Sequence, residues 1–444
     1  MNEIVQLAEE SPSVTAQAER PLRILMPSYR SHPFTGGQGV YMRHVTKALV
    51  EAGHHVDVIS GPPWPELDPR VGLVKLPSLD LYAQPKVFMG LPAIPRRAFT
   101  NYVDFYEYMA HISGAFPEPN TFGMRMVRYM KDRLDKYDVV HDNQTLCWGL
   151  LQLKRMGLPV VGTIHHPITR DRRISIDAAD TFSLRLLVRR WYSFLDMQIK
   201  VARRLDPVIV VSHSTKRDVA ADFRVRPERM TVVHHGIDTE QFRPLPHIER
   251  RANLLITTAS ADVPLKGLIY LIEAYAKLLP NHPDLELLVI GKLREGHTER
   301  TLKRLGLMEK VRFVSGVSDE ELTEHYASAT LAVSPSVYEG FGFPAGAALA
   351  CGVPTVATTG GSLPEVVGEA GVLVPVKDPD ALAAAIGALL RDAARRAELG
   401  AAGRRRMLDQ FRWSRAAHEL SQVYYRALNY APRHADREAR PVAA

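Results

Sequence analysis

The sequence predicts an α/β protein made of two doubly wound parallel-sheet domains that face each other across a cleft. Short apolar runs, which are typical of buried strands, alternate with amphipathic helical patterns along most of the chain. This alternation is interrupted once, by the polar, proline-containing stretch 236–252, and then resumes. The length of 444 residues suits two or three domains.

The first half of the chain predicts an N-terminal domain over residues 21–235. Residues 22–29 (LRILMPSY) form the first predicted strand, 35–39 (TGGQG) a turn, and 40–53 an amphipathic helix. Further strands are predicted at 54–61, 137–142, 158–165, 207–213 and 230–235.

The second half predicts a C-terminal domain over residues 253–412, joined to the first by a linker at 236–252. It begins with a strand at 253–260 and a helix at 266–280. Later strands are predicted at 285–292, 311–316, 331–336, 354–360 and 371–375. A last helix is predicted at 413–430. The terminal segments 1–20 and 431–444 are predicted to be disordered because they carry no apolar pattern.

Composition narrows the classes of function. Lys and Arg exceed Asp and Glu by 56 to 49, a mild bias that suits an anionic small molecule or an anionic membrane surface. We find no zinc-finger spacing, no RNA-binding aromatic signature and no dense basic block, so nucleic acid is not an expected partner. Two distant cysteines, Cys147 and Cys351, and a polar first segment predict a cytoplasmic protein.

Glycines follow the first predicted strand at the point where the first helix opens. Gly36 and Gly37 there allow backbone N–H groups to approach an anion at the helix N-terminus. Met42 stands where a dinucleotide-binding fingerprint would require its third glycine, so that fingerprint is not supported. A simple tight turn explains the two glycines equally well.

Charged and polar side chains occur at other strand ends. Lys266 opens the predicted helix 266–280, where it serves either as a phosphate ligand or as a solvated lysine. His165 and His166 stand at the carboxyl end of strand 158–165, where α/β active sites gather. They are interpreted either as groups that bind sugar or move protons, or as imidazoles satisfied within a polar strand end.

The stretch VYEGFGFPAGAALACG (337–352) places Glu339 in a turn after a strand. Gly340 and Gly342 there expose backbone N–H groups, and Pro344 fits the first helical position. A similar strand-to-helix turn follows one strand later, with Gly360, Gly361 and Glu365. The alternative for both is ordinary turn chemistry.

Taken together and in this order, these stretches resemble family four of the retaining glycosyltransferases. The resemblance also includes VVSHSTKRDV, VVHHGIDTEQFRP, PLKG, VSGVSDEELTEHYASATLAVSPSVYEGFGFP, ACGVPTVATTGGSLPEVVG and GVLVPVKDPDALAAAI, and extends from about Leu22 to Leu428. It implies the GT-B architecture, with two Rossmann-like domains and a C-terminal helix that crosses back to the N-terminal domain.

The resemblance also implies site roles. His165, with His166 as the alternative, contacts the donor sugar, Lys266 binds the donor phosphates, and Glu339 holds sugar hydroxyls. The backbone groups of Gly340, Phe341 and Gly342 donate to the sugar. Further donor-binding positions are Gly36 and Gly37 near the diphosphate, Val317 beside the base, and Gly360, Gly361 and position 347.

Two positions depart from the family pattern. The second glutamate of the family's Glu-x7-Glu motif, which binds the ribose hydroxyls, is Ala347 here. An arginine common about five residues before the lysine is Ala261 here, and Arg294 is the candidate replacement. Hydrogen bonds to a charged group contribute roughly 1.5–3 kcal/mol, so the loss of the carboxylate predicts donor binding weakened about ten- to a hundred-fold.

The implied activity is transfer of a sugar, with retention, from a nucleoside diphosphate, UDP or GDP, to a hydroxyl of a glycan, lipid-linked or small-molecule acceptor. No cofactor beyond this co-substrate and no metal site are expected. A catalytically impaired protein that binds nucleotide sugars or glycans is the alternative, motivated by Ala347. A nucleotide-sugar epimerase of the same fold is a lesser alternative.

Two basic and apolar stretches of the N-terminal domain raise the question of membrane contact. Residues 183–195 mix Arg185, Arg189 and Arg190 with Trp191 and Phe194, and residues 124–137 are similar. Each stretch is interpreted either as a core helix with a solvated basic edge or as a peripheral contact with anionic lipid at the inner face of the membrane. The oligomeric state is not predicted.

Overall fold

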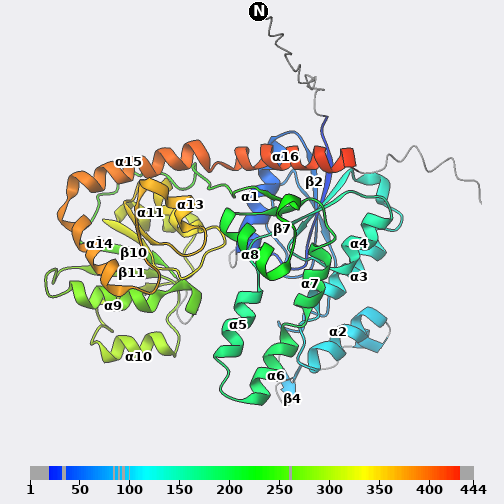
Figure 1. Cartoon of the computed structure of the whole chain (residues 1–444), viewed down its shortest axis with the longest axis horizontal. Helices are drawn as coiled ribbons and strands as arrows, with labels where there is room; N and C mark the ends of the chain where they lie inside the picture. Colours follow the sequence, from blue (N-terminus) through cyan, green and yellow to red (C-terminus); the bar gives the residue numbers. More distant parts are fainter. Residues whose placement is uncertain are drawn as a thin grey trace, which may run out of the picture.

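The computed structural model describes residues 20–32, 37–83, 86–88, 91–92, 96–99, 101–259 and 263–430. Two parallel sheets with helices on their faces form two domains, blue to green and yellow to orange in Figure 1. The predicted two-domain α/β fold is confirmed. Of the predicted disordered ends, only Arg20 is within the described residues. Gly36 and Ala261 also lie outside them.

The N-terminal sheet has seven strands in the order β3-β2-β1-β6-β7-β8-β9, and neighbouring strands are parallel. The strands are β1 (Arg23–Ser28), β2 (His55–Ser60), β3 (Gly72–Lys75), β6 (Val139–Asn143), β7 (Val160–Ile164), β8 (Val208–Val210) and β9 (Met230–Val232). A separate antiparallel pair joins β4 (Lys86–Phe88) and β5 (Leu91–Pro92). The sequence analysis missed β3, which is only half-buried and therefore lacks a continuous apolar run.

The helices of the N-terminal domain connect these strands by crossovers. They are α1 (Gly37–Glu51), α2 (Tyr102–Ile112), α3 (Glu118–Met130), α4 (Trp148–Arg155), α5 (Thr169–Asp177), α6 (Phe182–Trp191), α7 (Phe194–Ala202) and α8 (His213–Phe223). Short 3-10 turns lie at η1 (Arg96–Phe99), η2 (Leu134–Lys136) and η3 (Pro227–Arg229). Helix α1 begins three residues earlier than predicted, and a Cβ on Gly39 would lie 1.8 Å from the carbonyl oxygen of His32.

The C-terminal sheet has six strands in the order β12-β11-β10-β13-β14-β15, all parallel. The strands are β10 (Leu254–Thr258), β11 (Glu286–Ile290), β12 (Val311–Val314), β13 (Leu331–Ser334), β14 (Thr355–Thr358) and β15 (Val372–Val374). The helices are α9 (Leu268–Leu278), α10 (His297–Arg304), α11 (Asp319–Ser328), α12 (Phe343–Ala350), α13 (Leu363–Val367), α14 (Pro379–Arg391), α15 (Ala393–Gln410) and α16 (Trp413–Tyr430), with 3-10 turns η4 (Pro264–Lys266) and η5 (Gly368–Ala370).

The last helix, α16, returns to the N-terminal domain, as predicted (Figure 1, top). Its apolar side chains Leu420 and Tyr424 pack in one buried cluster with Met42 and Val45 of α1. The chain therefore crosses between the domains twice. At this point Ile237 pairs with Arg412 in a β-bridge, and the Ile237 amide donates to the Phe411 carbonyl at 2.6 Å. The two crossing segments are therefore paired with each other at the domain boundary.

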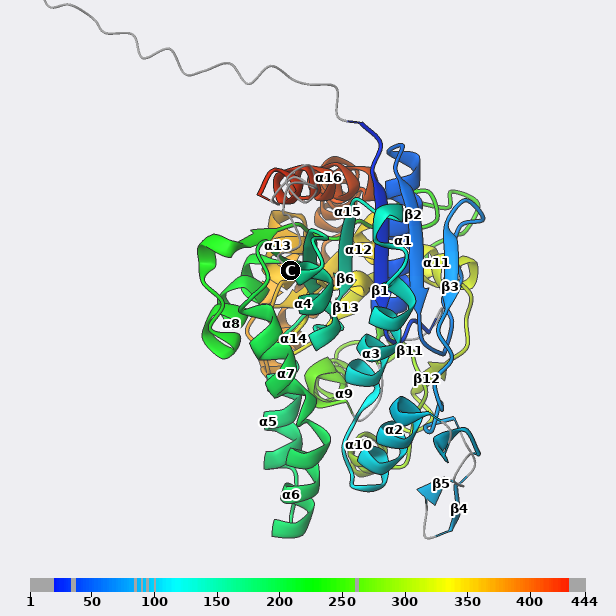
Figure 2. The ribbon, with the colours of Figure 1, turned by 90° about the vertical axis from the view of Figure 1, so that its right-hand side faces the viewer.

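The two basic stretches differ in structure. Helix α3 buries Met126 and Met130 and exposes Arg128, which confirms the core-helix interpretation for residues 124–137. That interpretation is wrong for α6, which has no buried residue and exposes Phe182 and Leu186. Figure 2 shows α5 and α6 extending below the N-terminal sheet, so α6 reaches beyond the core that would cover it. Membrane contact there stays a prediction, and among the described residues no helix is long and apolar enough to cross a membrane.

A buried carboxyl group lies near the carboxyl ends of β1, β2 and β3. Glu118 opens α3, and its Oε2 has no hydrogen-bond partner among the described residues. A guanidinium nitrogen of Arg30 is 3.6 Å away, which is too far for a hydrogen bond. The hydroxyl of nearby Tyr82 is likewise buried without a partner. Burial raises the pKa of Glu118 to about 8, against the opposing charge of Arg30.

The raised pKa of Glu118 predicts a pH-dependent stability. The fold favours the protonated form, so its stabilising contribution is complete below about pH 4.5 and is lost as the pH rises toward 8. A pKa shift of this size corresponds to on the order of 5 kcal/mol of stability. We expect Glu118→Gln, a neutral isostere, to lose less stability than the wild type between pH 5 and 8 in thermal unfolding. Parallel pH profiles for the two proteins would contradict this.

Candidate functional site

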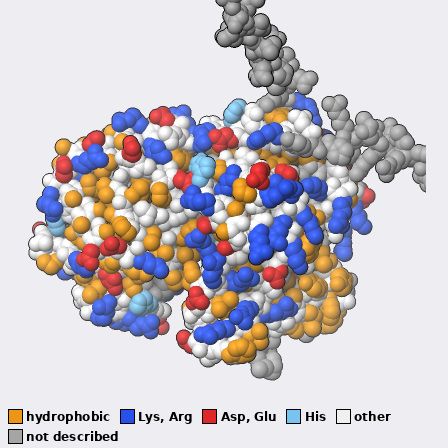
Figure 3. All heavy atoms as spheres, viewed as in Figure 1, with side chains coloured by type: hydrophobic (Ala, Val, Ile, Leu, Met, Phe, Trp, Pro, Cys, Tyr) orange, Lys and Arg blue, Asp and Glu red, His pale blue; other side chains and the backbone are white. Residues whose placement is uncertain are grey.

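The two domains meet where the carboxyl end of β7 faces the turn after β13. A Cβ on Gly340 would lie 2.4 Å from the carbonyl oxygen of His165, so only glycine fits at this position. The Thr215 hydroxyl in α8 lies 3.4 Å from the carbonyl oxygens of both His165 and Gly340. The structure thus brings together His165 and the Glu339 turn, which the sequence placed in different domains. Figure 3 shows the surface hollowed between the two halves at its lower edge.

The imidazole of His165 lies within a hydrogen-bonded network. Its Nε2 is 2.6 Å from the side-chain oxygen of Asn143, whose amide nitrogen donates to Ser28. Asn143 is therefore the acceptor and Nε2 carries the proton. Its Nδ1 is 3.0 Å from Nε2 of His235. Burial lowers the pKa of His165 to about 3, with smaller contributions from neighbouring histidines, so the ring is neutral at pH 7.

The neighbouring histidine has a different environment. His166 faces Asp171 at 3.0 Å with a half-exposed side chain. His165, in contrast, contacts Tyr41 edge-to-face with ring centroids 4.8 Å apart. Of the two, only His165 lies in the buried network beside the Glu339 turn. Its contact with the donor sugar stays a prediction.

Lys266 and Glu339 form an ion pair in the C-terminal domain. The Lys266 ammonium nitrogen is 2.8 Å from Glu339 Oε1, and the Ser336 hydroxyl donates to the same oxygen at 2.7 Å. Glu339 is buried, whereas about a third of the Lys266 side chain is exposed. The two groups expected to bind the donor therefore hold each other in position.

The predicted position of Lys266 in the first turn of a helix is wrong. Lys266 ends the 3-10 turn η4, and α9 begins two residues later. Gly267 between them has φ of +63°, and a Cβ there would lie 2.0 Å from the Pro335 carbonyl oxygen. This left-handed glycine separates Lys266 from the start of α9 and lets the lysine approach the turn after β13.

Gly360 and Gly361 pack directly under the Glu339 turn. A Cβ on Gly360 would lie 2.4 Å from the Ser336 carbonyl oxygen, and one on Gly361 would lie 2.1 Å from that of Glu339. The amide of Ser362 donates to the Glu339 carbonyl at 3.0 Å. Gly360 and Gly361 thus contact the Glu339 turn. Their role in donor binding stays a prediction.

Position 347, where the family resemblance implies a glutamate, has apolar surroundings. Ala347 is buried on α12 in a cluster that also contains Tyr326 and Cys351, and Val317 packs against that cluster. Positions 347 and 317, both predicted to bind the nucleoside, are thus in one region. Arg294, the candidate for the second cation, is exposed in the loop after β11 and has no ion pair among the described residues.

The remaining predicted donor-binding groups come from both domains. Gly342 has φ of +96° and caps the N-terminus of α12, and Phe341 is buried against His235. Gly37 begins α1, and no packing neighbour among the described residues lies within 4 Å of a Cβ added there. Its partner Gly36 lies outside the described residues. Within the described ranges, no group of three or more His, Cys, Asp or Glu side chains is arranged to hold a metal ion.

Sequence reasoning missed a carboxylate that joins the domains. Glu365 on α13 accepts from the backbone amides of His213 and Ser214, both at 2.8 Å, at the N-terminus of α8. His234 Nε2 is 3.1 Å from the same carboxylate. Burial opposes ionisation, but these hydrogen bonds lower the pKa of Glu365. The sequence showed only a turn glutamate, and its partners are about 150 residues away.

Comparisons with known proteins identify the family to which this chain belongs. The model described as "Glycosyltransferase Family 4" matches residues 35–241, and that described as "Glycosyl transferases group 1" matches residues 242–406. An MMP α-(1→4)-mannosyltransferase of Mycolicibacterium hassiacum is 46% identical over 92% of this chain and 98% of that protein. A D-inositol 3-phosphate glycosyltransferase of Geodermatophilus obscurus is 30% identical over 88% of this chain and 84% of that protein.

Solved structures show the same architecture. A sucrose-phosphate synthase of Thermosynechococcus elongatus superposes with a TM-score of 0.67 at 25% identity, covering 92% of this chain and all of the other. Alr3699/HepE of Anabaena, in complex with UDP and glucose, has a TM-score of 0.65 at 17% identity, covering 91% of this chain and 99% of the other. The chain therefore belongs to glycosyltransferase family four, of the group 1 glycosyl transferases, and has the GT-B fold.

Proposed function

We propose that this chain transfers a mannosyl unit, with retention of configuration, from a UDP- or GDP-linked donor to a hydroxyl of a glycan. The name of the relative that is 46% identical supports the sugar and suggests an α-(1→4) linkage. The HepE structure, with UDP and glucose, shows a protein of this fold in contact with a nucleotide and a sugar. Both are properties of those proteins, and the proposal extends them to this chain.

One observation carries the proposal: Lys266 pairs with Glu339 in the turn that contacts the strand end bearing His165. Lys266 supplies a cation for the donor diphosphate, and Glu339 supplies carboxylate oxygens for sugar hydroxyls. His165 is neutral, so it adds no charge beside the donor. Its ring N–H is donated to Asn143, and on donor binding it exchanges that contact for a sugar hydroxyl. On donor binding, Lys266 exchanges part of its contact with Glu339 for the phosphates.

The proposed reaction breaks the bond between the sugar C1 and the diphosphate oxygen and forms a bond from C1 to the acceptor oxygen on the same face. The electron pair of the broken bond leaves with the diphosphate. The acceptor proton passes to an oxygen of that leaving group. Lys266 stabilises the developing negative charge.

The test is direct. Purified protein is incubated with GDP-mannose, UDP-glucose and other nucleotide sugars and a manno-oligosaccharide acceptor, and the product's anomeric configuration is read by NMR. We expect Lys266→Ala to lower kcat about a hundred- to a thousand-fold because it removes charge stabilisation at the leaving group. Lys266→Arg should recover part of the rate. A Lys266→Ala variant with wild-type kcat, or an inverted product, would overturn the proposal.

A nucleotide-sugar or glycan binding protein with little turnover is the second candidate. The observation that favours it is the apolar environment of Ala347, where the family places a ribose-binding carboxylate. A panel of nucleoside diphosphates and nucleotide sugars in thermal unfolding separates the candidates when combined with the transfer assay. Stabilisation by a nucleotide sugar without product formation would favour the binding protein.

The variant Ala347→Glu tests the role of this position. We expect its Kd for the nucleotide sugar to fall about ten- to a hundred-fold, because the new carboxylate accepts hydrogen bonds from the ribose hydroxyls. The unliganded protein should melt at a lower temperature, since the charge enters an apolar cluster. Ala347→Gln matches the size without the charge and should gain less affinity. Equal Kd values for wild type and Ala347→Glu would show that position 347 does not contact the donor.

A further inference from the structure

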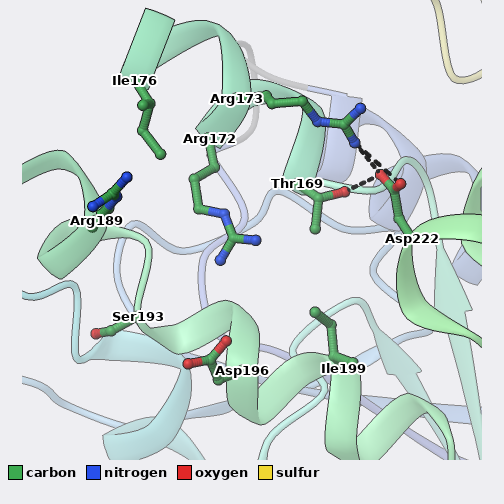
Figure 4. A pocket seen from close by; sticks show the side chains of 9 residues that line it. All are labelled: Thr169, Arg172, Arg173, Ile176, Arg189, Ser193, Asp196, Ile199 and Asp222. Atoms are coloured by element: carbon green, nitrogen blue, oxygen red, sulfur yellow. Dashed lines mark hydrogen bonds and ion pairs between the residues drawn. The ribbon is translucent and has the colours of Figure 1, made fainter. Parts of the chain in front are cut away.

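A cavity of about 510 Å³ lies within the N-terminal domain, between helices α5, α6, α7 and α8 (Figure 4). This volume falls in the range of roughly 300–1,000 Å³ typical of small-molecule sites. Three arginines line it, Arg172 and Arg173 from α5 and Arg189 from α6. None of these residues belongs to the donor-binding set described above.

The three arginines are not equivalent. Arg173 donates twice to Asp222, at 3.0 and 3.1 Å, and the Thr169 hydroxyl donates to the same carboxylate. Asp222 is thereby neutralised. Arg172 and Arg189 have no ion pair or side-chain hydrogen bond among the described residues. Figure 4 shows the guanidinium of Arg172 pointing into the open space. The cavity therefore presents two uncompensated guanidinium groups.

The opposite wall carries a different chemistry. Asp196 of α7 turns its carboxylate toward the cavity and has no ion pair within the described ranges (Figure 4). Ser193, three residues before Asp196, also lines the cavity, and Ile176 and Ile199 add apolar surface. A bare anion would be repelled by Asp196. A sugar satisfies both walls, because hydroxyls donate to a carboxylate while an anionic substituent accepts from the guanidinium groups.

The cavity is separate from the donor site. Thr169, Arg172, Arg173 and Ile176 share one face of α5, since they follow the spacing i, i+3, i+4, i+7. Arg170 lies on another face, where it pairs with Asp218 and stacks over the ring of Tyr338 in the C-terminal domain, 4.3 Å from its centroid. The donor-side turn therefore contacts a different side of α5 from the cavity.

From these contacts we propose that the cavity is a second saccharide-binding site, which takes a sugar unit bearing a phosphate or carboxylate group. Arg172 and Arg189 bind the anionic substituent, Asp196 and Ser193 bind hydroxyls, and the isoleucines contact the C–H face of the ring. Because α5 begins four residues after His165, a unit held here belongs to the acceptor side of the protein. That last step rests on the proposed function, whereas the binding itself does not.

Calorimetric titration of the full-length protein tests the site. The probes are mannose 6-phosphate, glucuronic acid, mannose and inorganic phosphate, which distinguish phosphate from carboxylate as the substituent. We expect at least one of the two acidic sugars to bind, at least tenfold more tightly than mannose and inorganic phosphate. The double variant Arg172→Gln/Arg189→Gln should raise its Kd at least tenfold. Arg226→Gln, which removes an exposed arginine of the same domain, should leave the Kd unchanged.

Two further variants test whether the acidic sugar binds in this cavity and whether its hydroxyls are recognised. Lys266→Ala disables the proposed donor phosphate site and should leave the acidic sugar's Kd unchanged. Asp196→Asn should weaken binding of the acidic sugar but not of inorganic phosphate, because only the sugar has hydroxyls for the carboxylate. All variants are first checked for wild-type melting temperatures.

Several results would overturn the proposal. They are no binding of either acidic sugar, binding lost in Lys266→Ala, binding unchanged in the double arginine variant, and inorganic phosphate bound as tightly as the sugars. Failure of this site is distinguishable from failure of the transferase proposal, because transfer is measured with a neutral acceptor and the titration requires no turnover.

Discussion

The site depends on a single close approach between the backbones of the two domains. Gly340 lies so near the carbonyl oxygen of His165 that no side chain fits between them. Gly361 supports the same turn from below and is excluded from carrying a side chain by the Glu339 backbone. These two approaches hold the Glu339 turn against the carboxyl end of β7. The domains are also joined by Glu365, which caps α8 across the domain boundary, and by the pairing of Ile237 with Arg412.

Charge within the site is arranged around this contact. The buried Glu339 is compensated by Lys266, and the buried His165 is neutral. Burying the Glu339 carboxylate beside the partly exposed Lys266 costs less free energy than burying it alone. The ion pair therefore holds both side chains in place when no donor is bound. Ala347 carries no charge, and the apolar cluster around it needs no compensation. If the proposed donor site is correct, it contains fewer carboxylates than the family resemblance implies.

The two-domain fold and the family could be predicted from the sequence for identifiable reasons. Continuous apolar runs marked the buried strands, and the ordered motifs from TGGQG to GGSLPE identified the family. The edge strand β3 was not predicted because it is only half-buried and lacks a continuous apolar run. The position of Lys266 was misjudged because the left-handed conformation of Gly267 depends on Pro335, some 70 residues away. Helix α6 was misjudged because exposure is a property of the surroundings and not of the pattern. The partners of Glu365 and the cavity beside Arg172 join segments that only the fold brings together.

The contact between Gly340 and His165 is tested most directly by Gly340→Ala. Gly340 does not have a left-handed φ, so alanine adds no backbone strain and only the approach to His165 changes. The measurement is small-angle X-ray scattering of the variant beside Gly37→Ala, whose added methyl meets no packing neighbour within 4 Å in the described part of the chain. The account predicts a larger radius of gyration for Gly340→Ala alone, with both domains still folded by circular dichroism. A Gly340→Ala protein as compact as the wild type would contradict it.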